Sequence, residues 1–293
     1  MKIKDLENVS IIGLGLLGGS LGLALDRVFS HVKRVGFSHR LITRKRALDA
    51  QVVDVCCDTV AQAVKDAQLV VLSSPIGTFP ALMQEMASSL PAGCVVTDVG
   101  STKVLPVSWA RKFLPRSVEF IGSHPMAGSE QRGVDFARAD LFDGAHCFVT
   151  PTPKTKKQTL VFLQQFWQAI GMRVSPMTPA MHDRLLARIS HLPHVLAMTL
   201  VNCSDPSETL LCGKGFLDTT RIASGPTSIW QDILMGNAKH TASAVKRVIK
   251  ELSRVQKALE EGDEKAITTM LNKARTRRNE LVEKKIQRRE LPT

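Results

Sequence analysis

The sequence contains no uncharged apolar run of the ~18 residues from which a membrane-spanning helix is built. Its first residues, Met1 to Asp5, lack the basic stretch followed by an apolar stretch that begins a secretory signal. None of the six cysteines stands in a Cys-x-x-Cys pair, the spacing of many zinc sites and of thioredoxin-like redox motifs. We therefore expect a soluble, cytoplasmic protein with reduced thiols, without a metal and without a membrane partner.

Acidic residues are outnumbered by basic ones, 27 against 39, which gives a net charge of +12 at pH 7. Such a charge can attract a nucleic acid, a membrane surface or an anionic small molecule. Much of the excess lies in the last thirty residues, where glutamates interrupt the basic residues at helical spacing and no aromatic residue is present to stack on bases. We interpret this segment as a solvated helix face and expect no nucleic-acid partner.

The length of 293 residues and the apolar content of 44% predict two folded domains. Up to about residue 178, short β-branched runs alternate with helical segments, which is typical of a parallel sheet with crossover helices. The expected strands are Val9–Ile12, Arg34–Phe37, Leu69–Leu72, Val95–Asp98, Phe120–Ile121, Cys147–Thr150 and Arg173–Ser175. The expected fold class is α/β, with a Rossmann-like doubly wound sheet in residues 1–178 and an all-helical dimerisation domain in residues 179–293.

The second domain is expected to open with a long helix. Thr178 is a suitable N-cap, Pro179 fits the first helical position, and Pro193 predicts a kink. A later helix, expected to stop at Gly262 before a new N-cap at Asp263, carries an apolar stripe at i, i+3, i+4 and i+7 spacing: Val245, Val248, Ile249, Leu252, Val255 and Leu259. Such a stripe often packs against a second copy of the chain, so we predict a homodimer; packing within one chain is the alternative.

A glycine motif follows the first expected strand. Residues 13–18 have the pattern Gly-x-Gly-x-x-Gly and run into an amphipathic helix. Gly13 permits a tight turn, Gly15 lets the backbone approach a pyrophosphate, and Gly18 allows close packing of helix and strand, with the phosphates at the positive helix N-terminus. The residues expected to contact a dinucleotide here are Gly13, Gly15, Leu16, Leu17 and Gly18.

The end of the second expected strand carries no acidic residue. An NAD enzyme usually has Asp or Glu there for the ribose 2′-hydroxyl, whereas this chain has Ser38, His39 and Arg40. An acid would repel a 2′-phosphate, but a hydroxyl and a guanidinium can bind one through charge-assisted hydrogen bonds. We therefore expect NADP as the cofactor. NAD is the alternative, with the ribose held elsewhere and a basic surface loop at this position.

Three further segments at strand ends are polar and turn-forming: 73–76, 98–103 and 122–130. Ligands of open parallel sheets bind beyond the carboxyl ends of the strands, so we expect these segments to meet in one cleft. The cofactor contacts expected there are Ser74, Pro75 and Ser101. His124 lies just beyond an expected strand end and is stiffened by the following proline, which favours a functional role over a structural one.

Together these segments resemble the prephenate and arogenate dehydrogenase family over nearly the whole chain. The resemblance is carried by residues 13–18, Asp98-Val99-Gly100-Ser101-Thr102-Lys103, Ser123-His124-Pro125-Met126-Ala127-Gly128-Ser129-Glu130, Ser190-His191-Leu192-Pro193-His194, and Phe216-Leu217-Asp218-Thr219-Thr220-Arg221-Ile222-Ala223 with Trp230 beyond. It implies that His124 is the catalytic base, that Ser101 lies near the substrate hydroxyl and the nicotinamide, and that Arg221 anchors the ring carboxylate. It also implies that Glu130, beside Ser129, is an acidic residue at the mouth of the substrate site.

Several residues keep alternative interpretations. His191 and His194 are three residues apart on the kinked helix, so one of them could contact the substrate side chain; a buried core histidine is the alternative. A metal site is disfavoured because no third ligand is spaced with them. Arg221 could instead form an ion pair with Asp218, and Trp230 could belong to the core or to the cleft wall.

The expected function is oxidative decarboxylation of prephenate with hydride transfer to NADP, on the route to tyrosine, with arogenate as the alternative substrate. Another NADP-dependent β-hydroxyacid or imine reductase would share the fold, but the hydroxyacid enzymes use a lysine in the first long helix after the linker, and residues 180–202 contain none. A non-catalytic NADPH sensor would account for the basic C-terminal helix. It would not explain why Ser101, His124 and Arg221 all occur in the same sequence.

Overall fold

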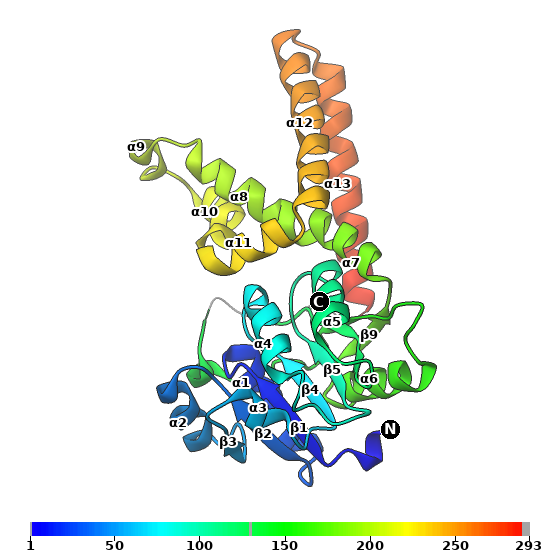
Figure 1. Ribbon diagram of the computed structural model, residues 1–293. Coiled ribbons are helices and arrows are strands. Elements are labelled where there is room, and N and C mark those ends of the chain that lie inside the picture. Colours follow the sequence, from blue (N-terminus) through cyan, green and yellow to red (C-terminus); the bar gives the residue numbers. More distant parts are fainter. Residues whose placement is uncertain (1, 129–130, 289–293) are drawn as a thin grey trace. The chain divides into compact units, whose positions relative to one another are not determined.

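The computed structural model describes residues 2–128 and 131–288 (Figure 1). The chain forms two compact units, Met1–Ala238 and Lys239–Thr293. The domain boundary expected at residue 178 falls inside the first unit and stays a prediction. None of the helices in the described ranges combines the length and the apolar content that crossing a membrane requires.

The first unit contains a six-stranded parallel sheet in the order β3-β2-β1-β4-β5-β6. Its strands are β1 (Asn8–Ile12), β2 (Lys33–Phe37), β3 (Val55–Cys56), β4 (Leu69–Leu72), β5 (Val95–Asp98) and β6 (Glu119–Phe120). The chain moves outward from β1 to β3, then returns to β4 on the other side of β1, so the winding direction reverses between β1 and β4. That reversal is the switch point at which such sheets bind ligands. The predicted α/β class with a Rossmann-like sheet is confirmed.

Successive residues of the central strands point to opposite faces of this sheet. Ile11 and Val71 belong to a buried cluster that includes residues of α1 and α6, whereas Ile12 and Leu72 belong to a second cluster with residues of α3, α4 and α5. The helices of this part are α1 (Leu16–Val28), α2 (Leu41–Asp49), α3 (Val60–Val64), α4 (Phe79–Met86), α5 (Val104–Phe113) and α6 (Lys157–Ala169). Both faces of the parallel sheet are therefore covered, which explains why the central strand β4 is apolar and buried at every position.

A second sheet of three strands follows, and the sequence predicted it only in part. It consists of β7 (Gly122–Pro125), β8 (His146–Thr150) and β9 (Arg173–Pro176), with β7 antiparallel and β9 parallel to β8. The expected extension of one parallel sheet through these strands is wrong. Residues 122–125 belong to the segment for which the sequence predicts a polar turn beyond a strand end, and glycine and proline are indeed poor strand formers. Pairing of the β7 backbone with β8 outweighs that local preference.

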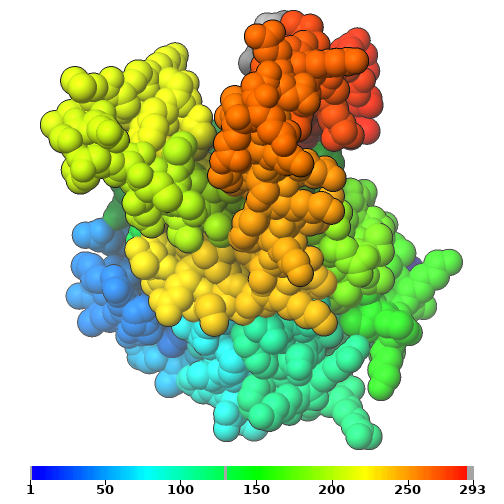
Figure 2. Space-filling view, turned by 90° about the horizontal axis from the view of Figure 1, so that it is seen from above, coloured from blue at the N-terminus to red at the C-terminus, as the bar shows by residue number. Residues whose placement is uncertain are grey.

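Helices make up the rest of the first unit: α7 (Pro179–Leu186), a π-helical turn (Ala187–His191), α8 (Leu192–Asn202), α9 (Pro206–Thr209), α10 (Lys214–Thr220) and α11 (Thr227–Gly236). The hydroxyl of Thr178 accepts a hydrogen bond from the backbone of Met181 at 3.2 Å, as expected for an N-cap. Where the sequence predicts a kink, a π-helical turn interrupts the α-helical geometry directly before α8, and Pro193 lies in the first turn of α8. In Figure 2 the yellow to gold part, which contains α11, lies against the cyan part, which contains α4.

The second unit is a pair of long helices, α12 (Ala238–Glu260) and α13 (Glu264–Gln287). Gly262 has a positive φ of 65° and the carboxylate of Asp263 accepts a hydrogen bond from the backbone of Ala266, so the predicted stop and N-cap are confirmed. Three residues of the predicted apolar stripe are exposed on α12: Ile249, Leu252 and Leu259.

Candidate active site

Three glycines shape the turn between β1 and α1. Gly13 has a positive φ of 108°, and a Cβ added there would lie 2.5 Å from the backbone nitrogen of Ser74. A Cβ on Gly18 would collide with the carbonyl oxygen of Gly13. A Cβ on Gly15, in contrast, would meet no atom within 4 Å. Packing of the turn therefore requires Gly13 and Gly18, whereas Gly15 borders open space that a ligand can fill.

The N-terminus of α1 borders this open space. Gly15 is the N-cap residue and offers no side-chain acceptor to the first N–H groups of the helix. These groups need an acceptor, and the helix dipole favours a negatively charged one. Leu16 and Leu17 form the first turn and line the adjoining cavity. The residues present thus fit the pyrophosphate of a dinucleotide.

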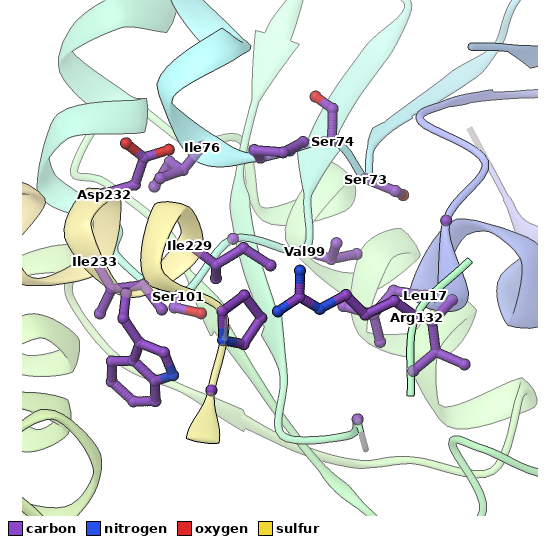
Figure 3. A pocket seen from close by; sticks show the side chains of 18 of the residues that line it. Leu17, Ser73, Ser74, Ile76, Val99, Ser101, Arg132, Ile229, Asp232 and Ile233 are labelled. Atoms are coloured by element: carbon purple, nitrogen blue, oxygen red, sulfur yellow. The ribbon is translucent and has the colours of Figure 1, made fainter. Parts of the chain in front are cut away.

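A cavity of about 610 Å³ lies beside the glycine turn, wholly within the first unit (Figure 3). Its walls come from the ends of β4 and β5, from the loop after β7, and from residues of the helical segment 221–233. The expected site residues that line it are Gly15, Leu16, Leu17, Ser74, Pro75, Ser101 and Arg221. The predicted meeting of three strand-end segments in one cleft is confirmed. Arg132, which belongs to no motif of the sequence analysis, also projects into this cavity (Figure 3).

The segment after β2 lies outside the lining of this cavity. Ser38 is buried, whereas His39 and Arg40 are exposed. The guanidinium of Arg44 donates to the carbonyl oxygen of Ser38 at 2.9 Å and pairs with Asp58 at 3.0 Å. Arg40 forms no ion pair with any residue in the described ranges, so it is the guanidinium here that can bind an added anion.

His124 lies within β7, not beyond a strand end as expected, and is 7% exposed. Its Nδ1 lies 2.9 Å from Nε2 of His182, and Nδ1 of His182 lies 2.8 Å from Oδ1 of Asp183. The sequence did not identify His182 or Asp183, because two adjacent polar residues near the start of a helix match no motif. The three side chains form a buried chain of hydrogen bonds, and none of the three is among the residues that line the cavity.

Burial lowers the pKa of His124 well below its usual range, and the neighbouring His182, Lys103 and His191 act in the same direction. The imidazole is therefore neutral near pH 7 and can act as a base.

A buried ion pair ties β5 to β7. Lys103 and Asp98 are fully buried and hydrogen-bonded to each other, and Nζ of Lys103 also donates to the carbonyl oxygen of Ser123 at 2.7 Å. Asp98 accepts from the backbone of Ser123 at 3.2 Å and of Gly100 at 2.9 Å. These bonds fix the chain on both sides of Ser101 and directly before His124.

The two other histidines of interest lie behind the cavity wall. The ring of His194 stacks on Trp230, with centroids 3.5 Å apart and planes 11° apart, and Trp230 lines the cavity. His191 is buried, its Nδ1 lies 3.2 Å from Nδ2 of Asn237, and its Nε2 has no hydrogen-bond partner in the described chain. Neither histidine lines the cavity directly. Trp230 is therefore a cleft wall, one of the two interpretations left open.

The expected substrate contacts Ser129 and Glu130 lie outside the described residues.

Two family models match the chain. The nucleotide-binding domain of prephenate dehydrogenase matches residues 21–176, and the dimerization domain of prephenate dehydrogenase matches residues 178–273. The chain belongs to the prephenate dehydrogenase family.

Individual members of the prephenate dehydrogenase family are similar over most of the chain. The prephenate dehydrogenase of Bacillus subtilis (strain 168) is 33% identical over 264 residues, which are 88% of this chain and 71% of the relative. The crystal structure of prephenate dehydrogenase from A. aeolicus in complex with hydroxyphenyl propionate and NAD+ matches with a TM-score of 0.87 and 30% identity, covering 94% of this chain and 99% of that one. Synechocystis arogenate dehydrogenase matches with a TM-score of 0.81 and 26% identity, at 94% and 99% coverage.

As a member of the prephenate dehydrogenase family, the chain is an NAD(P)-dependent oxidoreductase. The alternative of a non-catalytic sensor is thereby excluded. The relatives are named for different substrates, so the similarity shows the class of reaction. The substrate and the cofactor of this chain have to be inferred from its own residues.

Proposed function

We propose that this enzyme oxidises and decarboxylates prephenate to 4-hydroxyphenylpyruvate and transfers the hydride to NADP. The proposal rests on one observation: Leu16 at the helix N-terminus, Ser101 and Arg221 line the same cavity. Groups suited to a pyrophosphate, a hydroxyl and a carboxylate thus face one space. Prephenate carries a hydroxyl and a carboxylate at opposite ends of one ring, which matches this arrangement. Arogenate has the same ring, and the similarity to an arogenate dehydrogenase makes it the second candidate.

His124 is the proposed base. Its lowered pKa leaves the imidazole neutral, so a ring nitrogen can accept the proton of the substrate hydroxyl. Ser101 orients that hydroxyl, and Arg221 holds the ring carboxylate through two parallel hydrogen bonds. The side chain of the substrate extends towards Trp230, on which His194 stacks.

The reaction needs one proton to be taken up and returned. When bound, the nicotinamide accepts the hydride that leaves C4 of the substrate. Removal of the hydroxyl proton leaves a ring ketone; the bond between C1 and the carboxylate then breaks, its electron pair enters the ring, and the resulting phenolate takes back a proton. Aromatisation supplies the driving force. The protein therefore contributes chiefly by positioning the groups and by holding the proton on His124.

The choice of NADP is supported by the segment after β2. No acidic residue occupies positions 38–40, Arg40 is exposed, and the nearby carboxylate of Asp58 is bound to Arg44. A 2′-phosphate could therefore approach Arg40 without facing an unpaired carboxylate.

A homodimer built through the helical region is also proposed. Residues 178–273 match a dimerization domain, and Leu210 and Leu211, directly after α9, are 86% and 89% exposed. Neighbouring leucines exposed to this extent are typical of a surface that a partner covers.

The experiment that tests the function is a set of four initial-rate assays, with prephenate and arogenate each combined with NADP and NAD, followed by absorbance of the reduced nicotinamide. Prephenate with NADP is expected to give the largest kcat/KM. Replacing the base, in His124→Asn, should lower kcat by roughly 10²–10⁴ with little change in NADP affinity. His31→Asn, on the exposed loop after α1, is the control that should behave as wild type. No turnover in any of the four assays, by a folded protein that binds NADP, would overturn the proposal.

A further inference from the structure

In the buried hydrogen bonds that join His124, His182 and Asp183, each donor and each acceptor can be assigned. Asp183 is arranged as an acceptor: its Oδ1 receives the backbone N–H of Lys103 at 2.8 Å, and its Oδ2 receives that of Val104 at 2.9 Å. These are the first N–H groups of α5, which have no acceptor within their own helix. A side chain from α7 thus caps α5, and its carboxylate has no proton to give to His182.

That arrangement determines where the protons of the two histidines lie. Because Asp183 accepts, Nδ1 of His182 must carry the proton of their 2.8 Å hydrogen bond. A neutral His182 then has a lone pair on Nε2, which lies 2.9 Å from Nδ1 of His124. The hydrogen bond between the rings therefore requires the proton on Nδ1 of His124, and Nε2 of His124 is left as its basic atom.

We propose that His182 and Asp183 are positioning residues that hold His124 in the tautomer with a free Nε2 lone pair, the atom that takes the substrate proton. The proposal rests on the function proposed above, in which His124 is the base. The ring of Phe148 packs against that of His182, with centroids 5.7 Å and planes 74° apart, and helps to fix the orientation of the His182 ring.

The first test reads the tautomers directly in the full-length wild-type protein. Long-range ¹H–¹⁵N spectra of histidine-labelled enzyme, assigned with the variants below, should show a protonated Nδ1 and an unprotonated Nε2 for both His124 and His182 near neutral pH. A protonated Nε2 on His124 would overturn the proposal. This measurement needs no turnover, so it stands apart from the outcome of the substrate assays.

The second test compares three variants of α7. His182→Leu removes the acceptor and should lower kcat by about 10²-fold, with an unchanged NADP dissociation constant. His182→Gln keeps a carbonyl oxygen that can accept from Nδ1, so it should recover about a tenth or more of the wild-type kcat. Leu186→Ala, a buried change in the same helix, should lower the melting temperature but leave kcat and its pH profile close to wild type. The proposal fails if His182→Leu has the same kcat as Leu186→Ala. It also fails if the kcat of His182→Gln is no higher than that of His182→Leu.

Discussion

The carboxylate of Asp232 on α11 accepts a hydrogen bond from the backbone N–H of Gly77 at 3.1 Å. Gly77 belongs to the turn that follows β4, and Ile76 from this turn lines the cavity beside Asp232 (Figure 3). A Cβ on Gly77 would lie 2.8 Å from Oδ2 of Asp232, so glycine is what allows the approach. The bond links the dinucleotide side of the cavity to the helix that carries Trp230.

Removing the hydrogen bond between Asp232 and Gly77 should weaken the binding of NADP. Asp232→Ala leaves the N–H of Gly77 to water, because the bond is exposed, and the net loss should be about 0.5–1.5 kcal/mol. We expect the KM for NADP to rise several-fold and kcat to change less, because the reacting groups lie elsewhere. Asp232→Asn keeps an acceptor oxygen and should retain most of the wild-type KM. Equal effects of the two variants would show that charge, not this hydrogen bond, matters.

The glycine turn offers a matched pair of substitutions. Gly15→Ala adds a methyl group to open space at a backbone conformation that alanine tolerates, with φ of −84°, so the fold should be unaffected. The same methyl occupies the place expected for the pyrophosphate, and NADP binding should weaken by about tenfold or more. Gly18→Ala collides with the carbonyl oxygen of Gly13 and should instead lower thermal stability. Calorimetric titration and thermal unfolding of both variants separate the two roles; an unchanged NADP affinity in Gly15→Ala would place the pyrophosphate elsewhere.

The sequence predicted the glycine turn and the order of elements because both depend on local rules. Short β-branched runs define β1, β4 and β5, and the motif at residues 13–18 specifies its own turn. The capped helix start at Thr178 was equally local. Each of these features could be expected without knowing what packs against it.

The parts that the sequence did not predict depend on distant partners. The strand β7 exists because β8 pairs with it, and β8 lies about two dozen residues further on. The partnership of His124 and His182 joins residues 58 positions apart, and Arg132 enters the cavity from a loop. Sequence patterns of neighbouring residues carry no information about such contacts. His124 could therefore be predicted as the base, but its partners His182 and Asp183 could not.

Cofactor preference should respond to Arg40 and not to every nearby arginine. Arg40→Ala removes a charge-assisted contact to a 2′-phosphate and should raise the KM for NADP by roughly 10–100-fold, with little effect on NAD. Arg46→Ala is the control, because Arg46 lies on α2, the helix for which Arg40 is the N-cap residue, but already pairs with Asp135 at 2.6 Å. Steady-state kinetics with both cofactors give, for each variant, the ratio of the KM for NADP to the KM for NAD. Equal responses to NADP and NAD in Arg40→Ala would argue that the 2′-phosphate is not bound there.

Acid should destabilise the first unit through its buried histidines, and His191 allows a quantitative test. Burial lowers the pKa of His191 to about 4, although the nearby Asp183 acts in the opposite direction. A histidine whose pKa is lowered by folding stabilises the native state fully above its unfolded pKa of about 6.5, and this contribution is lost as the pH falls towards the folded value. Urea unfolding should therefore show a steep loss of stability between about pH 6.5 and about pH 4.

The variant His191→Gln cannot gain a proton, so its free energy of unfolding should fall by at least about 1 kcal/mol less than that of wild type over the same interval. His124 and His182, whose pKa values are also lowered by burial, continue to contribute in this variant, so part of the pH dependence remains. His31→Gln removes an exposed histidine and should keep the full wild-type slope. If the slopes of His191→Gln and wild type coincide, His191 is not held neutral by the fold, and the buried environment assigned to it behind Trp230 is wrong.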